Sequence, residues 1–181
     1  MDQPGRIAER LLVTSGNLVA FDVDAIVNAA NSSLLGGGGV DGAIHRAAGP
    51  QLLEECRRLQ GCLPGQAKLT RGYRLPARYV IHTVGPVWSG GTRGEPDILA
   101  ACYRNSLVLA VENEIRTLAF PAISCGIYGY PVDRAAAIAV RETASFLRQD
   151  ARIDKVFLVC FGEDTLAAYR DAYVQHLDES S

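Results

Sequence analysis

Short apolar runs alternate with amphipathic stretches along almost the whole sequence, and this alternation constrains the fold more than any other feature. Runs such as Val80-Ile81 and Val156-Phe157-Leu158-Val159 are apolar without interruption, which is typical of strands covered on both faces. The stretches between them repeat apolar residues at helical spacing. The pattern therefore predicts an α/β sandwich with helices on both faces of a central sheet.

Six segments are predicted to be strands, at residues 9–13, 25–29, 66–70, 79–84, 117–120 and 155–160. Helices are predicted over residues 40–48, 51–59 and 97–111. Two further helices are marked by apolar stripes, formed by Ala136, Ala139, Val140, Thr143, Ala144 and Leu147, and by Leu166, Tyr169, Tyr173 and Leu177. Residues 89–96 are glycine-rich and polar, and we expect a mobile surface loop there.

Length and composition point to one soluble domain, with a core over about residues 7–177 of the 181 and short polar tails. The net charge of −2 provides no broad basic field, so we expect no nucleic-acid partner. No apolar run approaches the ~20 residues that span a bilayer. We therefore expect no membrane association, and we expect a monomer.

The cysteine pattern indicates a reducing compartment. The five cysteines are odd in number and contain no C-x-x-C spacing: Cys56, Cys62, Cys102, Cys125 and Cys160. Several lie within apolar patterns, which favours buried free thiols. Residues 1–12 also lack the apolar core of a signal peptide, so we expect a cytoplasmic protein.

Four consecutive glycines, Gly36, Gly37, Gly38 and Gly39, separate the apolar strand at residues 25–29 from a predicted helix. Glycines permit positive φ and remove side-chain bulk, so backbone N–H groups can converge on an anion. The helix N-terminus that follows adds free donors and the positive end of its dipole. This segment therefore predicts a phosphate or diphosphate site.

A second strand–loop–helix unit, Phe120 to Pro131, repeats this arrangement with small residues and two tyrosines, Tyr128 and Tyr130. Ligands of open α/β sheets bind at the carboxyl ends of strands, where two such loops can face each other. We therefore expect a diphosphate to be held between the two loops.

Other nucleotide-binding classes fit less well. The spacing Gly37-x-Gly39-x-x-Gly42 satisfies the dinucleotide fingerprint, but that motif needs an acid about 20 residues further on, at the end of the next strand. Glu54 and Glu55 come too early and lie in a helical pattern. The sequence contains no G-x-x-x-x-G-K-[ST], which argues against an NTPase, and no G-x-S-x-G elbow of a serine esterase.

Three segments together resemble the macrodomain family: residues 25–49, the run His82-Thr83-Val84-Gly85-Pro86-Val87-Trp88, and Phe120 to Pro131. The match is greatest with the MacroD-type branch of ADP-ribose hydrolases and O-acetyl-ADP-ribose deacetylases, and it covers residues from about 12 to 177. The resemblance implies a three-layer α/β/α fold around a mixed sheet. It also implies a cleft for ADP-ribose, with no metal and no cofactor.

The resemblance implies roles for individual residues. Around the diphosphate and the distal ribose it places Gly36, Gly37, Gly38, Gly39, Val40, Ser124, Cys125, Gly126, Ile127 and Tyr128. It places Phe161 against the adenine ring, with Asn17 and Leu18 beside it. The family usually has Gly-Asp-Ile where this chain has Gly16-Asn17-Leu18. It commonly has threonine at the position of Cys125, and tyrosine at that of Phe161.

Three residues are the candidates for catalysis: Asn31, Asp41 and Tyr128. Asp41 could serve only as an acid at a helix start, but a carboxylate beside a diphosphate loop adds charge repulsion, which a purely structural residue would avoid. We expect it to orient or deprotonate a water. Asn31 could cap a turn, and its donors and acceptor also suit a ribose diol. Tyr128 could close over the ribose and position the water.

The remaining reactive residues have simpler explanations. His45 lies one helical turn beyond Asp41 on the same face, and we leave it outside the catalytic set. His82 is expected to be a core or loop-anchoring residue. A nucleophilic pair of Cys125 and His82 lacks a third orienting group, and no metal-ligand spacing occurs.

The leading hypothesis is therefore a hydrolase that cleaves ester-linked ADP-ribose, from O-acetyl-ADP-ribose or from mono-ADP-ribosylated glutamate or aspartate of proteins. The alternative is a reader module that binds ADP-ribose without turning it over. Asn31 and Asp41 argue against the reader, since a reader needs neither an acid nor an amide at the scissile end. Cleavage of poly-ADP-ribose chains and binding of terminal adenosine in nucleic acid are weaker alternatives.

Overall fold

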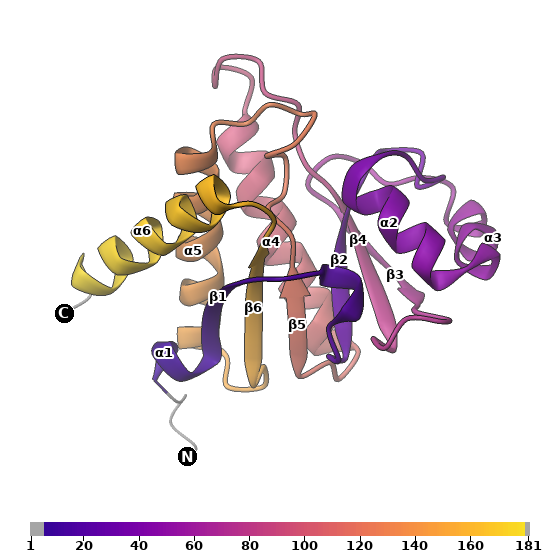
Figure 1. The fold of residues 1–181 in the computed structure, drawn as a ribbon, viewed down its shortest axis with the longest axis horizontal. Coiled ribbons are helices and arrows are strands. Elements are labelled where there is room, and N and C mark those ends of the chain that lie inside the picture. Colours follow the sequence, from indigo (N-terminus) through magenta and orange to yellow (C-terminus); the bar gives the residue numbers. More distant parts are fainter. Residues whose placement is uncertain (1–5, 180–181) are drawn as a thin grey trace.

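The computed structural model describes residues 6–179, within which six strands form one mixed sheet. The strands are β1 (Leu11–Ser15), β2 (Ala25–Ala30), β3 (Ala67–Arg71), β4 (Tyr79–Val84), β5 (Thr117–Phe120) and β6 (Lys155–Cys160). Their order across the sheet is β1-β6-β5-β2-β4-β3, from left to right in Figure 1. All neighbouring pairs are parallel except β3 and β4, which are antiparallel.

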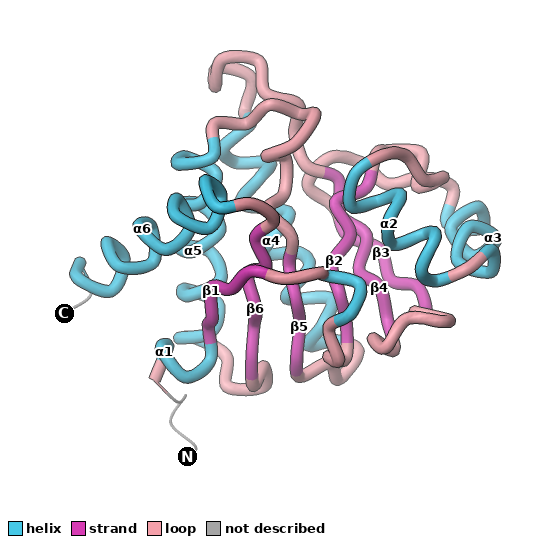
Figure 2. Tube along the Cα trace, in the orientation of Figure 1, coloured by secondary structure: helices cyan, strands magenta, loops and turns pink. Residues whose placement is uncertain are grey.

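Helices cover both faces of this sheet, as the alternation predicts (Figures 1 and 2). They are α1 (Ile7–Arg10), α2 (Gly39–Ala48), α3 (Pro50–Leu59), α4 (Glu95–Glu112), α5 (Val132–Gln149) and α6 (Glu163–Glu179), with a short 3-10 turn η1 (Leu18–Ala20). The predicted three-layer α/β/α architecture is confirmed. Between residues 6 and 179, no helix combines the length and the apolar character needed to cross a membrane.

Two hydrophobic cores lie on opposite faces of the sheet, because successive side chains of a strand point in opposite directions. Val27 and Ile81 pack into the core beneath α4, α5 and α6, whereas their neighbours Ile26 and Val80 pack into the core beneath α2 and α3. All four side chains are fully buried. Burial on both faces is the physical reason for the uninterrupted apolar runs.

The N-terminal strand begins two residues later than predicted, at Leu11, and residues 7–10 form the helix α1. The cause is Arg10, whose guanidinium is buried and donates hydrogen bonds to the carbonyl oxygens of Leu147, Asp150 and Ile153. These carbonyls lie at the end of α5 and in the turn before β6. Arg10, the second residue of the predicted strand, gave no local sign of these distant partners.

The loop before α4 is held in place by a carboxylate, which local composition did not indicate. Glu95 is buried at the start of α4, and its carboxylate accepts hydrogen bonds from the backbone N–H groups of Ser89, Gly91 and Arg93 at 2.6–2.8 Å. The helix therefore begins at Glu95, two residues before the predicted Asp97. Residues 89–94 form a loop wrapped around this acid.

These hydrogen bonds make the contribution of Glu95 to the stability of the protein depend on pH. Burial alone would raise the pKa of Glu95, but the backbone N–H donors outweigh it and lower the pKa from 4.5 to about 2. We expect a Glu95→Gln variant to be less stable than the wild type at neutral pH. The difference should shrink as the pH falls from 4.5 towards about 2, where the wild-type carboxylate becomes protonated.

Urea unfolding midpoints of the two proteins across this pH range measure the effect. Other acidic groups titrate alike in both proteins, so their contributions cancel in the difference. Glu112→Gln, at an exposed position at the other end of α4, is the matched control and should show no such trend. A wild-type advantage over E95Q that stays constant with pH would contradict this account of the loop.

Candidate active site

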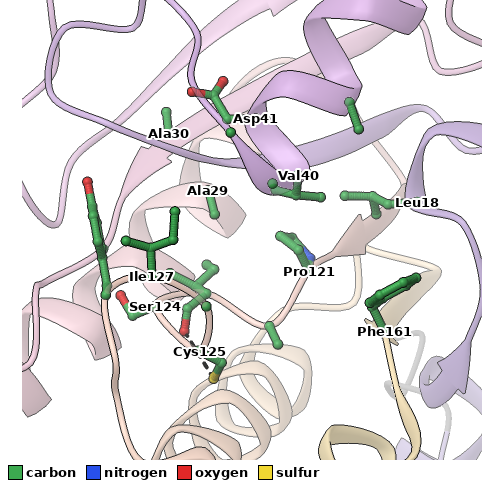
Figure 3. A pocket seen from close by; sticks show the side chains of 18 of the residues that line it. Leu18, Ala29, Ala30, Val40, Asp41, Pro121, Ser124, Cys125, Ile127 and Phe161 are labelled. Atoms are coloured by element: carbon green, nitrogen blue, oxygen red, sulfur yellow. Dashed lines mark hydrogen bonds between the residues drawn. The ribbon is translucent and has the colours of Figure 1, made fainter.

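A large cavity of about 750 Å³ opens at the carboxyl ends of the parallel strands (Figure 3). This volume lies within the range of small-molecule sites, roughly 300–1,000 Å³. Its walls come from the residues after β1, β2, β4, β5 and β6 and from the first turn of α2. The cavity therefore stands where the two glycine-rich loops predict a ligand.

The first loop presents backbone donors to this cavity. The N–H groups of Gly38, Gly39 and Val40 make no hydrogen bond within residues 6–179, and all three residues line the cavity. Gly39 has a φ of +58°, a left-handed conformation that glycine adopts without steric cost. Since these groups also begin α2, the positive end of the helix dipole adds to them, and the arrangement favours an anion.

The second loop faces the first with donors of its own. Throughout the described part of the chain, the N–H groups of Gly126, Ile127 and Tyr128 find no acceptor, and all three residues line the cavity. Ser124 has a φ of +65°, which is strained for a residue with a Cβ, and its buried hydroxyl has no hydrogen-bond partner among residues 6–179. Such strain and unused donors are typical of functional loops.

Asn31 and Asp41 converge at one end of the cavity. A Cβ placed on Gly37 would lie 3.3 Å from Asp41 Oδ2 and 3.4 Å from Asn31 Nδ2, so the bare glycine leaves space between the two groups. Asn31 also stabilises its own turn, because Nδ2 donates to the Gly36 carbonyl (2.9 Å) and Oδ1 accepts from Ser33 (2.6 Å). One N–H and one lone pair of its amide remain for a ligand.

The Asp41 carboxylate is buried, and a residue outside the cavity lining holds it by a hydrogen bond. Asn28 Nδ2 donates to Asp41 Oδ1 at 2.9 Å, and His45 Nε2 lies 3.4 Å from the same oxygen without hydrogen-bond geometry. Burial acts to raise the pKa of Asp41, but the adjacent imidazole of His45 and the Asn28 amide outweigh it and lower the pKa below its ordinary value. The side chain is therefore an ionised carboxylate at neutral pH.

The opposite end of the cavity carries an exposed aromatic side chain. Asn17, Leu18 and Phe161 line it, and the Phe161 ring is 92% exposed. Figure 3 shows Phe161 and Asp41 on opposite sides of the cavity, with Val40 between them. An exposed ring at a cavity mouth provides a stacking surface for a planar group.

The structure argues against the Cys125–His82 pair. His82 is fully buried within β4, and its two ring nitrogens contact Asn28 Nδ2 (3.1 Å) and Thr70 Oγ1 (2.8 Å). Burial raises the pKa of the Cys125 thiol to about 11, and its Sγ donates to the Ile123 carbonyl. The thiol therefore stays protonated and lacks a base, and the prediction of a core position for His82 is confirmed.

The structure brings almost all of the predicted site residues to one cavity, with one exception. Gly36 does not line the cavity. Its carbonyl accepts from Asn31, and a Cβ at this position would lie 3.7 Å from the His45 ring, so it supports the loop from behind. Its left-handed φ of +91° explains the glycine without any ligand.

Sequence reasoning missed several positions. Lining residues not predicted include Ala29, Ala30, Gly85, Pro121 and Thr165. Asn28 was also missed, although a polar residue inside the apolar run Ile26–Ala30 was a usable signal. Its β-sheet register places it opposite His82, another polar residue inside an apolar strand.

The fold and the cavity together define a three-layer α/β/α protein with a cavity lined by backbone donors at the carboxyl edge of its sheet. Residues 27–139 match the family model described as Macro domain. This match spans more than half of the chain, and the chain belongs to the Macro domain family.

Curated relatives from bacteria and vertebrates are similar over most of the chain. It is 63% identical over 156 residues to Macro domain-containing protein CT2219 of Chlorobaculum tepidum, covering 86% of this chain and 91% of that protein. It is 57% identical over 162 residues to an O-acetyl-ADP-ribose deacetylase of Klebsiella pneumoniae, covering 87% and 93%. It is 54% identical over 166 residues to ADP-ribose glycohydrolase MACROD2 of Xenopus laevis, covering 91% of this chain and 40% of that protein.

Solved structures share the same fold. A mutant macrodomain of Oceanobacillus iheyensis with ADPR superposes with a TM-score of 0.90 at 40% identity, covering 96% of this chain and 97% of that one. A macrodomain of Trypanosoma brucei in complex with ADP-ribose gives a TM-score of 0.85 at 48% identity, covering 90% and 68%.

The strained Ser124 generates a stability prediction. In the left-handed conformation of Ser124 its Cβ costs about 1–2 kcal/mol, and replacement by glycine removes this strain. Glycine also makes the unfolded chain more flexible, which lowers the stability by roughly 0.5–1 kcal/mol. We expect Ser124→Gly to raise the free energy of unfolding by about 0.5–1 kcal/mol, measured by urea denaturation. Ser124→Ala keeps the Cβ and should show no relief of strain. A glycine variant less stable than the wild type would contradict the assignment of strain.

Proposed function

We propose that this protein binds ADP-ribose and hydrolyses ester linkages to it. The substrates are O-acetyl-ADP-ribose and proteins that carry mono-ADP-ribose on glutamate or aspartate. The observation that carries the proposal is the convergence of Asn31 and Asp41 at the end of a cavity lined by unused backbone donors. The name of the Klebsiella relative, an O-acetyl-ADP-ribose deacetylase, supports ester hydrolysis, and that of the Xenopus relative, an ADP-ribose glycohydrolase, supports hydrolytic release of ADP-ribose.

The two loops suit the diphosphate of this ligand. N–H groups without a partner among residues 6–179, on Gly38, Gly39 and Val40, face those of Gly126 and Ile127 across the cavity. Backbone donors carry no side-chain entropy, and the α2 dipole adds a favourable field for the phosphate charges. The adenine would then stack on Phe161, and the distal ribose would reach Asn31 and Asp41.

Hydrolysis requires one water at the acyl carbon of the ester. The water oxygen forms the new bond to that carbon, the carbon–oxygen bond to the ribose breaks, and a proton goes to the ribose oxygen. Asp41 would accept a hydrogen bond from this water and orient it, since its carboxylate is ionised and fixed by Asn28. Asn31 would hold the ribose hydroxyls, and Tyr128 would cover the ribose. This mechanism rests on positioning one water against a bound ester.

The proposed function belongs to a single domain. The six strands of the described residues share one sheet, which supports one functional unit.

The protein is also proposed to act in a reducing compartment. Its five cysteines are free thiols, four of them buried, which supports a location such as the cytoplasm.

Release of free ADP-ribose tests the proposal directly. The protein is incubated with O-acetyl-ADP-ribose and with a protein mono-ADP-ribosylated on glutamate, and products are followed by chromatography. We expect Asp41→Ala to lower turnover by about 100-fold or more while ADP-ribose affinity, measured by calorimetry, changes far less. Asn31→Ala should lower both. Asp171→Ala, at an exposed carboxylate on α6, should leave both unchanged.

Two outcomes would redirect the proposal. Wild-type turnover in the Asp41→Ala variant would refute the role of this carboxylate. Tight binding of ADP-ribose without release from either substrate would make the protein a reader module.

The exposed ring of Phe161 gives a separate prediction for affinity. Base stacking on an aromatic side chain is worth about 1–3 kcal/mol, so Phe161→Ala should weaken ADP-ribose binding by about 5-fold to 150-fold. Phe161→Tyr retains the stacking surface and is the matched control. Because the ring is 92% exposed, neither substitution should move the thermal midpoint of the free protein. If the wild type and Phe161→Ala bind ADP-ribose with equal affinity, adenine does not stack at this end of the cavity.

A further inference from the structure

A chain of buried hydrogen bonds runs behind Asp41 and crosses three strands. Thr70 on β3 contacts His82 Nε2 at 2.8 Å, His82 Nδ1 on β4 lies 3.1 Å from Asn28 Nδ2, and Asn28 on β2 donates to Asp41 Oδ1 at 2.9 Å. Thr70 is 2% exposed, and Asn28 and His82 are fully buried. None of these three residues lines the cavity, so none of them contacts a ligand bound there.

The direction of each hydrogen bond follows from the chemistry of the groups. The amide nitrogen of Asn28 can only donate, so His82 Nδ1 accepts from it. Burial lowers the pKa of His82 to about 4, so the ring is neutral and carries its one proton on Nε2. His82 Nε2–H therefore donates to Thr70 Oγ1, and the Thr70 hydroxyl stabilises this tautomer of the ring by accepting from it.

The orientation of Asn28 depends on this tautomer. Both of its N–H bonds point at acceptors, Asp41 Oδ1 and His82 Nδ1, whereas its Oδ1 is buried without a partner among residues 6–179. A rotated amide would place Oδ1 against both of these acceptors. If the ring carried its proton on Nδ1, this N–H would face the N–H of Asn28. Two donors would then oppose each other, and the amide would no longer be held with its nitrogen towards Asp41.

We propose that His82 and Thr70 are positioning residues, which hold the Asn28 amide with its nitrogen towards Asp41 and so fix the carboxylate that orients the water. This inference rests on the proposed ester hydrolysis. The other groups near this chain are His45, 3.4 Å from Asp41 Oδ1, and Cys56, whose Sγ lies 3.9 Å from His82 Nε2. Burial raises the pKa of the Cys56 thiol to about 11, so this thiol is neutral beside the His82 ring.

Two substitutions of Thr70 separate this role from simple packing. Thr70→Val preserves the shape of the side chain and removes the acceptor of His82 Nε2–H, whereas Thr70→Ser preserves the hydroxyl and leaves a small cavity. We expect T70V to lower kcat on O-acetyl-ADP-ribose by about tenfold with little change in KM, roughly the value of one buried hydrogen bond. T70S should keep kcat within about twofold of the wild type, so the hydroxyl rescues activity.

A role in packing alone would give the opposite order, with T70S impaired more than T70V, and that result would overturn the inference. Nitrogen NMR of the His82 ring provides a second readout that needs no turnover. The wild type and T70S should show the proton on Nε2, and T70V should shift the ring towards the Nδ1–H form. An unchanged tautomer in T70V would also overturn the inference, even if the wild type proves to hydrolyse neither ester.

Substitutions of His82 test the same series of hydrogen bonds at the residue that links Thr70 to Asn28. His82→Asn places an amide oxygen near the position of Nδ1, where it can accept from Asn28, whereas His82→Gln reaches the position of Nε2 instead. We expect H82N to retain more kcat than H82Q at matched urea midpoints, and H82Q to raise the pKa of Asp41 measured by carbon NMR. Equal losses of kcat in both variants, with the Asp41 pKa unmoved, would show that His82 contributes only to the core.

Discussion

The parallel pairing of β2 with both β4 and β5 governs the arrangement of this molecule. In that register Asn28 stands opposite His82, and Ile26 stands opposite Ala119. The carboxyl ends of these strands therefore lie at one edge of the sheet, and the two loops that follow β2 and β5 must face each other. A cavity between two rows of backbone donors follows from this pairing, because glycines and small residues such as Gly37–Gly39 and Ser124–Gly126 line much of both loops and leave the space open.

A carboxylate beside an anion site is electrostatically unfavourable, and the structure shows what offsets it. Asp41 follows directly after the free N–H groups of Gly39 and Val40, so it shares the positive end of α2. The Asn28 amide and the nearby His45 ring hold its pKa low in spite of burial. The carboxylate is thus stabilised by the protein alone, and its charge at this end of the cavity is available for orienting a polar group.

Much of the fold and of the site was predictable, because both depend on local pattern. Uninterrupted apolar runs such as Val156–Val159 indicate a doubly covered strand, and β4, β5 and β6 have the predicted bounds. Small residues in succession indicate loops that approach a ligand with their backbone, and Gly37, Gly38, Gly39, Ser124 and Gly126 all line the cavity. Gly36 resembled them in the sequence, yet its carbonyl binds Asn31, and only the path of the chain distinguishes the two roles.

The sequence by itself determined the layers, the two glycine-rich loops and the presence of an acid and an amide beside the first of them. The tertiary structure decided which distant groups these residues meet. Arg10 reaches carbonyls 137 to 143 positions away along the chain, and His82 reaches Asn28 across 54 positions. The physical reason is that periodicity and turn chemistry act over a few residues, whereas a buried polar group must find its partner wherever the packed sheet places one.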